Sequence, residues 1–249
     1  MDIDSLTARF STLFAGEQLA RDPTEWGWRI PHQPLDIRWI GYATTLTPEV
    51  VLEARERGVQ LIITHHDVWS FMFEMREQVQ TLLEDFKIAH LFVHAPLDDA
   101  DFGTSASLLK LTGCSGTGRF YEEDGFFWGR LGELAEALPL DDFERRLSGS
   151  LGEAPRQVLP ASGMVGRVGV VAGAGNMNAG LRAAVESGCD TYLTGEMTLY
   201  FLLYARHSKL NTLVYTHNYT EIHGVRNLVQ ALIGDQPGLE AIRLAEEHF

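Results

Sequence analysis

Leu61-Ile62-Ile63-Thr64-His65-His66 is an apolar, β-branched run that ends in two adjacent imidazoles. A run of this kind predicts a buried strand. Side chains alternate along a strand, so His65 and His66 point in opposite directions unless the strand ends there and the backbone turns. Two histidines that leave one strand end by different routes can each serve a different metal ion. The alternative is a strand that simply ends in two polar residues.

Helix and strand patterns alternate on both sides of this run. Thr47 and Pro48 open a helix that Gly58 ends, because these residue types favour a helix start and a helix stop. Further helices are predicted over 3–20, 71–86, 141–147, 178–188, 199–207 and 221–233, and further strands over 37–43, 91–93, 126–128, 168–172, 191–194 and 212–216. The alternation indicates an α/β fold with parallel sheets. The tail 239–249 fits a helix or a strand, and the Trp- and Pro-rich segment 23–34 is expected to cover a core edge or a subunit contact.

The second half of the chain repeats part of the first half. A shift of 130 residues aligns Ala54, Glu56, Gly58 and Thr64 with Ala184, Glu186, Gly188 and Thr194. A shift of 123 residues aligns the strand end at His94 and Asp98 with the one at His217 and Glu221. We therefore predict two similar three-layer α/β/α units, with a metal site between them at the carboxyl ends of their strands. Residues 1–120 together with about 217–249 form the first unit, and residues 121–216 form the second.

Composition narrows the classes of function. The chain has 249 residues, with 34 acidic and 20 basic side chains and a net charge of −14. This balance argues against a nucleic-acid binder but permits a small anionic substrate, because a metal can supply local positive charge. Cys114 and Cys189 form no CxxC motif, which favours a reducing compartment. No signal-peptide pattern and no apolar run of about 20 residues is present, so we expect a cytoplasmic protein that does not bind a membrane.

Seven polar residues follow the ends of the predicted strands, where open α/β sheets bind their ligands. They are His65, His66, His94, Asp98, Glu196, His217 and Glu221. Imidazoles and carboxylates without a thiol suit Zn, Mn, Fe, Co or Ni, and this mixture suits two ions bridged by a carboxylate. His94 is expected to orient Asp98 or to carry protons, with plain packing as the alternative. Glu196 is either a general base beside the metals or a polar strand end.

The glycine-rich turn Gly173-Ala174-Gly175 precedes a predicted helix. It predicts either a phosphate-binding turn or a tight connection between strand and helix. The tight connection is favoured, because Asn178 occupies the third glycine position of the dinucleotide fingerprint and the lysine of a P-loop is missing.

From Ile37 to Ile233 the chain resembles the Nif3-like dinuclear-metal proteins known as GTP cyclohydrolase I type 2 homologues. The resemblance is carried by four motifs: Ile62-Ile63-Thr64-His65-His66, His94-x-x-Leu97-Asp98, Gly188-x-Asp190-x-Tyr192-x-Thr194-Gly195-Glu196 and His217-x-x-x-Glu221. It implies that His65, Asp98 and Glu221 hold one ion. It implies that His66, His217 and Glu221 hold the other, with Glu221 bridging the pair. It also implies a toroidal homohexamer.

The surroundings of the site depart from the family pattern. Asp67 stands in place of a proline, Ala95 in place of a threonine, Glu196 in place of an aspartate, and the context Glu25-Trp26-Gly27 in place of Asp-Asn. The family label implies opening of the imidazole ring of GTP. We expect the broader activity of a hydrolase that uses two divalent transition-metal ions per chain on a nucleotide or on a small phosphorylated or purine-like compound. Glu196 and His94 are its predicted catalytic residues. The alternative is a non-catalytic metal-binding hexamer that acts as a metallochaperone or a regulatory protein.

Overall fold

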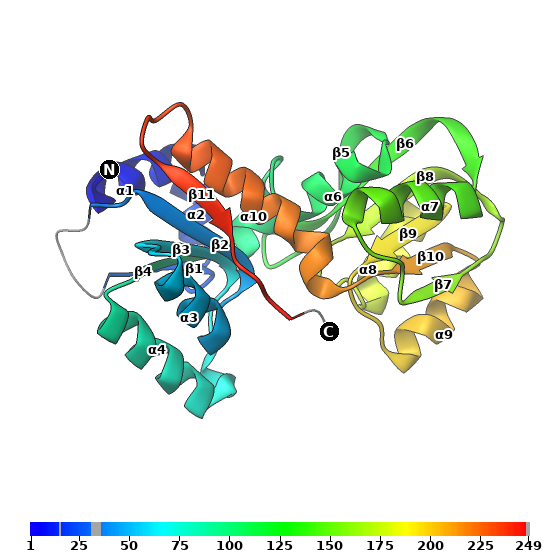
Figure 1. Ribbon diagram of the computed structural model, residues 1–249. Coiled ribbons are helices and arrows are strands. Elements are labelled where there is room, and N and C mark those ends of the chain that lie inside the picture. Colours follow the sequence, from blue (N-terminus) through cyan, green and yellow to red (C-terminus); the bar gives the residue numbers. More distant parts are fainter. Residues whose placement is uncertain (15, 31–35, 248–249) are drawn as a thin grey trace. The chain divides into compact units, whose positions relative to one another are not determined.

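The computed structural model describes residues 1–14, 16–30 and 36–247, so the end of the segment 23–34 lies outside the described residues. The chain forms two compact units, one of Met1–Leu97 with Val225–Glu247 and one mainly of Asp98–Gly224. Each unit has one sheet with helices packed on it, which confirms the α/β class (Figure 1). The sequence placed the unit boundaries near 120 and 217. The structure assigns 98–120 to the second unit because β5 (Ser115–Glu123) pairs in the second sheet.

Unit 1 is built on a five-stranded sheet in the order β1-β4-β3-β2-β11. Its strands are β1 (Trp26–Arg29), β2 (Trp39–Thr45), β3 (Leu61–His66), β4 (Ala89–Val93) and β11 (Glu240–Arg243). Its helices are α1 (Ile3–Leu13), α2 (Gly16–Arg21), α3 (Pro48–Glu56), the 3₁₀ turn η1 (Ser70–Met72) and α4 (Glu74–Phe86). The strands β11, β2, β3 and β4 run parallel, and β1 joins the edge antiparallel to β4.

The strand β3 lies between β2 and β4, and its first five residues are buried. This central position explains why its sequence is an unbroken apolar run rather than an alternating one. The helix α3 packs on the sheet through Val50 and Ala54, in the same core as Ile62. Its start is fixed by Thr47, whose hydroxyl accepts a hydrogen bond from the Val50 amide.

Unit 2 is built on a six-stranded sheet in the order β5-β6-β8-β9-β10-β7. Its remaining strands are β6 (Phe126–Pro139), β7 (Gln157–Leu159), β8 (Met164–Val171), β9 (Thr191–Thr194) and β10 (Asn211–Val214). Its helices are α6 (Thr104–Thr112), α7 (Leu140–Leu151), α8 (Asn178–Glu186) and α9 (Leu199–Ser208). Two further helices, α5 (Ala95–Asp99) and α10 (His217–Ile233), run across the unit boundaries. Only β8, β9 and β10 are parallel, and β5, β6 and β7 pair antiparallel.

The two units share one topology, which agrees with the repeat seen in the sequence. Unit 1 contains β2-α3-β3-α4-β4 with three adjacent parallel strands, and unit 2 contains β8-α8-β9-α9-β10 in the same arrangement. Equivalent turns also adopt the same backbone conformation. Gly58 and Gly188 have φ of 68° and 75° after the first helix of each unit, and Lys87 and Lys209 both have φ of 56° after the second.

The structure differs from the sequence prediction at two places near the predicted site residues. The helix α10 begins at His217 rather than at Glu221, so both residues lie on one helix. The edge strand β1 was not predicted as a strand, although Trp26 and Trp28 alternate with Gly27 and Arg29, because the run is only four residues long and lies in a Trp- and Pro-rich segment. The tail that fitted helix or strand forms β11. Among the described residues, no helix combines the length and the apolar character that a membrane-spanning helix requires.

Candidate metal centre

Unit 1 gathers three histidines at the carboxyl ends of β3 and β4. The ring centroids of His65 and His66 lie 4.6 Å apart, and that of His94 lies 4.9 Å and 5.5 Å from them. The strand β3 ends at His66, which lets both rings of the tandem pair turn to the same side. One ligand atom from each of the three residues lies within 4.8 Å of the other two. Unit 1 by itself therefore forms a group of imidazoles able to hold a metal.

Each of these imidazoles is held through its Nδ1 atom. Nδ1 of His65 lies 2.8 Å from the carbonyl oxygen of Val93, and Nδ1 of His94 donates to the carboxylate of Glu25. Nδ1 of His66 lies 3.0 Å from the Thr45 hydroxyl. A carbonyl and a carboxylate only accept hydrogen bonds, so the neutral rings of His65 and His94 carry their proton on Nδ1. Partners of this kind at Nδ1 are usual for imidazoles that bind a metal through Nε2.

A buried polar network lies beside the tandem histidines. Asp67, which stands where the family pattern has a proline, forms an ion pair with Arg29 and is buried. Nδ1 of His90 lies 4.0 Å from Asp67, and its Nε2 lies 2.8 Å from the Thr64 hydroxyl. Burial, and secondly the charge of Arg29, lower the pKa of His90 to about 3, so His90 is neutral in the folded protein.

In unit 2, His217 and Glu221 lie one turn apart on α10 and face each other. His217 Nε2 and Glu221 Oε2 are 3.2 Å apart, and the Glu221 carboxylate is buried. Nδ1 of His217 lies 2.6 Å from Oε1 of Glu196, whose other oxygen accepts a hydrogen bond from Asn176. Burial lowers the pKa of His217, but the charges of Glu221 and Glu196 outweigh it and raise the pKa to about 10. An imidazole with this strong preference for positive charge is well placed to accept a divalent cation in place of the proton.

The turn after β8 makes room for this pair. A Cβ atom on Gly173 would lie 1.8 Å from Oε1 of Glu221 and 2.8 Å from Nε2 of His217, so only glycine fits there. The Gly173 amide donates to the Thr220 hydroxyl, and the Gly173 carbonyl accepts from the Gly195 amide. The first bond uses the Gly173 amide, the kind of donor that a phosphate at this turn would need. The glycine-rich turn is thus the tight strand-to-helix connection that the sequence favoured, and it serves as the floor of the His217–Glu221 pair.

Asp98 is fixed within unit 2 by a second network. The Thr104 hydroxyl donates to the Asp98 carboxylate, which is 5% exposed. Next to it, Arg119 pairs with the buried Asp99 at 2.7 Å. The fully buried Arg130 donates to the Asp99 carbonyl oxygen at 2.5 Å. These contacts fix the end of α5, on which Asp98 lies.

The predicted site residues fall into two sets. The structure brings His65, His66 and His94 together in unit 1, and it brings His217, Glu221 and Glu196 together in unit 2. Asp98 lies in unit 2 as well.

The residues that hold these donors in place were missed by the sequence reasoning. They are Glu25, Thr45, Thr104, Arg130 and Asn176. Among these residues, only Glu25 had a hint in the sequence, because it is a charged residue in the segment that departs from the family pattern. The thiols take no part in the described donor groups, and both cysteines are free.

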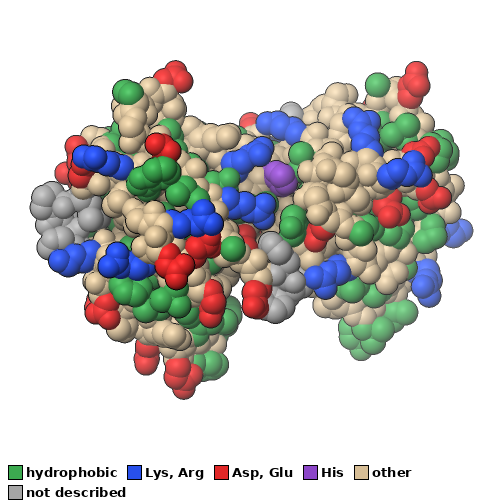
Figure 2. All heavy atoms as spheres, in the orientation of Figure 1, with side chains coloured by type: hydrophobic (Ala, Val, Ile, Leu, Met, Phe, Trp, Pro, Cys, Tyr) green, Lys and Arg blue, Asp and Glu red, His purple; other side chains and the backbone are tan. Residues whose placement is uncertain are grey.

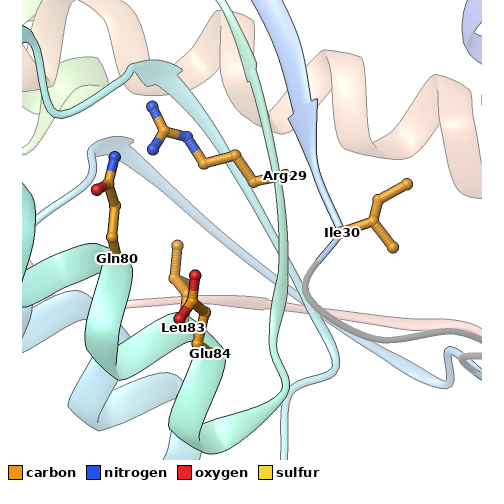
Figure 3. Close-up of a pocket in the computed structure, with 5 residues that line it drawn as sticks. All are labelled: Arg29, Ile30, Gln80, Leu83 and Glu84. Atoms are coloured by element: carbon orange, nitrogen blue, oxygen red, sulfur yellow. The ribbon is translucent and has the colours of Figure 1, made fainter.

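Unit 1 also contains a separate cavity of about 350 Å³, lined by Arg29, Ile30, Gln80, Leu83 and Glu84 (Figure 3). The Arg29 side chain extends across it toward the Gln80 amide, and Leu83 and Glu84 of α4 form its base. On the face of the molecule shown in Figure 2, both acidic and basic side chains are exposed.

The family model described as Duf34/NIF3 (NGG1p interacting factor 3) matches residues 1–247. Proteins named GTP cyclohydrolase 1 type 2 homolog are similar over most of their length. The one from Deinococcus radiodurans is 28% identical over 82% of this chain and 78% of its own length. The one from Pseudomonas aeruginosa is 27% identical over 90% of this chain and 86% of its own length. The resemblance recognised in the sequence motifs is therefore confirmed.

Solved structures agree on the fold. TTHA1606 from Thermus thermophilus superposes with a TM-score of 0.83 at 22% identity, covering 99% of both chains. Reduced HcgD from Methanocaldococcus jannaschii superposes with a TM-score of 0.83 at 20% identity, covering 99% of this chain and 98% of its own. At these identities the two structures establish the architecture of the chain.

Proposed function

Because this chain belongs to the Duf34/NIF3 family, we propose that it is a dinuclear metal-dependent hydrolase of a nucleotide or of a small phosphorylated or purine-like compound. The proposal rests on the way in which neighbouring groups hold the imidazole rings. Acceptors hold Nδ1 of His65, His94 and His217 and so orient these imidazoles, and His217 lies beside the buried Glu221 carboxylate. Imidazole and carboxylate donors without thiols fit a borderline divalent ion such as Zn, Fe, Mn, Co or Ni.

In this proposal His65, Asp98 and Glu221 hold one ion, and His66, His217 and Glu221 hold the other. A pair of divalent cations supplies polarisation of the substrate and a water activated at neutral pH. The Thr104 hydroxyl orients Asp98, and Glu196 orients His217. The general-base role of Glu196 and the proton-carrying role of His94 stay predictions. The names of the relatives support a purine nucleotide as one substrate class to test.

Metal analysis of purified protein tests the proposal. We expect about two transition-metal ions per chain in the wild type, in line with a two-metal site. Glu221→Ala should lose most of both ions, because one carboxylate bridges them. Glu186→Ala, which removes an exposed carboxylate of α8, is the matched control and should keep both. Retention of both ions by Glu221→Ala would refute the dinuclear site.

Turnover separates the hydrolase from its alternative. Metal-reconstituted wild type and the Glu221→Ala variant are screened against nucleotides and phosphate esters. Hydrolysis by the wild type alone supports the enzyme. Two bound ions without turnover of any compound favour the metallochaperone or regulatory protein.

The homohexamer also stays a prediction, and the surface of α9 supports it. Leu199, Tyr200 and Leu203 are 67%, 74% and 54% exposed on this helix. Adjacent apolar side chains exposed on one helix face indicate an interaction surface. Sedimentation equilibrium of the wild type measures the assembly, and replacement of Leu199 and Leu203 by serine should shift it toward smaller species.

A further inference from the structure

We propose that His94 is a metal donor of unit 1, and that Glu25 is the positioning residue that aims it. This inference rests on the proposed metal centre and extends it beyond the five ligands that the resemblance implies. It also replaces the predicted proton-carrying role of His94 with a structural role at the metal.

The first support is the geometry of the three imidazoles. His65, His66 and His94 each offer an atom within 4.8 Å of the others. Two nitrogens bound to one ion at about 2.1 Å lie at most about 4.2 Å apart, so a small ring movement brings His94 within reach of an ion held by one of the tandem histidines. Trp69 packs its ring at a steep angle against His94, with centroids 5.5 Å apart.

The second support is the way the sheet delivers Glu25. The edge strand β1 pairs antiparallel with β4, and Trp26 lies opposite Val93. This register places Glu25 beside His94, whose amide donates to the Glu25 carbonyl oxygen at 2.8 Å. The Glu25 carboxylate then accepts from His94 Nδ1 and from the Ala95 amide, at 3.4 Å for the amide. Backbone and side chain of Glu25 thus fix the imidazole together.

The third support is the equivalence of the two units. His94 follows β4 as His217 follows β10, and these strands are equivalent in the shared topology. In both places Nδ1 contacts a glutamate carboxylate, Glu25 in unit 1 and Glu196 in unit 2. A carboxylate bonded to Nδ1 raises the basicity of the imidazole and directs Nε2 toward a metal. His217 carries this arrangement next to Glu221, and His94 carries it next to two further imidazoles.

The donor set defines the class of ligand. Three imidazoles without a thiol favour first-row divalent cations such as Zn²⁺, Co²⁺ and Ni²⁺ over Mg²⁺ or Ca²⁺, which prefer oxygen. Co²⁺ is a suitable probe, because its visible absorption reports the number of nitrogen donors and its paramagnetism shifts the N–H protons of bound imidazoles.

The experiment measures Co²⁺ binding by the full chain in competition with a chromophoric chelator. The affinity for one ion should fall about 10–100-fold in His94→Ala and in Glu25→Ala, the usual loss for a disturbed metal environment. Glu25→Gln keeps an acceptor at the same place and should fall less. His207→Ala and Glu17→Gln, which change exposed side chains on α9 and α2, are the matched controls and should bind as the wild type.

Paramagnetic NMR supplies a readout that a purely structural role would not change. The Co²⁺-loaded wild type should show a shifted, exchangeable Nδ1–H signal that is absent from His94→Ala and moved in Glu25→Gln. Unchanged affinity, absorption and shifted signals in both variants would overturn the inference. If His94→Ala fails to fold, Glu25→Gln decides alone. A wild type that binds no Co²⁺, or a Glu221→Ala variant that keeps both ions, refutes the metal centre itself and is distinguishable from this outcome.

Discussion

Replacement of Gly173 by alanine tests the floor of the His217–Glu221 pair. The new Cβ would lie 1.8 Å from Oε1 of Glu221 and 2.7 Å from its Cδ. Restoring a 3.0 Å separation requires a displacement of the carboxylate by about 1.2 Å. Metal–oxygen bonds are about 2.0–2.2 Å long, so a displacement of this size removes Glu221 from coordination.

Two effects of this substitution can be separated. Gly173 has φ of 62°, and an alanine there costs about 1–2 kcal/mol of backbone strain. For a chain of this size, that strain lowers the melting temperature by roughly 2–8 °C. Disturbing an outer partner of a metal ligand costs about 10–100-fold in affinity, so loss of the bridging carboxylate should cost at least about 100-fold.

Gly163→Ala is the matched control for this prediction. Gly163 has φ of 72°, and a Cβ there meets no atom within 4 Å. Gly163→Ala should therefore have a lower melting temperature than the wild type but the same affinity for metal. Calorimetric melting and chelator competition measure the two quantities on both variants. Equal metal affinity in Gly173→Ala and Gly163→Ala would refute the role assigned to the turn.

Three further outcomes are expected. The pKa of His90 is lowered by burial from its ordinary value of 6.5 to about 3 in the folded protein, so its contribution is present above pH 6.5 and is lost as pH falls toward 3. Between pH 7 and pH 5, the free energy of unfolding measured with urea should therefore fall by about 2 kcal/mol less in His90→Gln than in the wild type. An equal fall in both proteins would contradict this prediction. Thr104→Val removes the hydroxyl that holds Asp98 and should weaken metal binding about 10-fold in chelator competition. The same replacement at an exposed threonine should leave the affinity for metal unchanged. Arg130→Met removes the buried donor to the Asp99 carbonyl oxygen, while Arg119 still pairs with the Asp99 carboxylate, and it should lower the free energy of unfolding by about 1–3 kcal/mol. Arg145→Met, at a 74% exposed side chain, should change the free energy of unfolding by less than about 0.5 kcal/mol.

Local patterns determined much of the fold. The apolar run that ends at His65-His66 forms the buried central strand β3, since a strand between two parallel neighbours has no polar face. Thr47, Pro48 and Gly58 bound α3 as predicted, because caps act within a few residues along the chain. The internal repeat indicated the equivalence of His94 and His217, which the topology of both units supports.

Only the tertiary structure decided how the donors are held. The contact of His94 with Glu25 joins residues 69 positions apart, and it depends on the register of a four-residue antiparallel edge strand, which no local pattern specifies. His217 and Glu221 face each other because α10 starts earlier than its apolar pattern does, and Gly173 packs against them from the turn after β8. Periodicity and capping encode the elements locally, whereas ring orientation depends on which side chains meet after the sheets form. The sequence therefore determined which residues can bind metal, and the fold decided which of their atoms are presented to it.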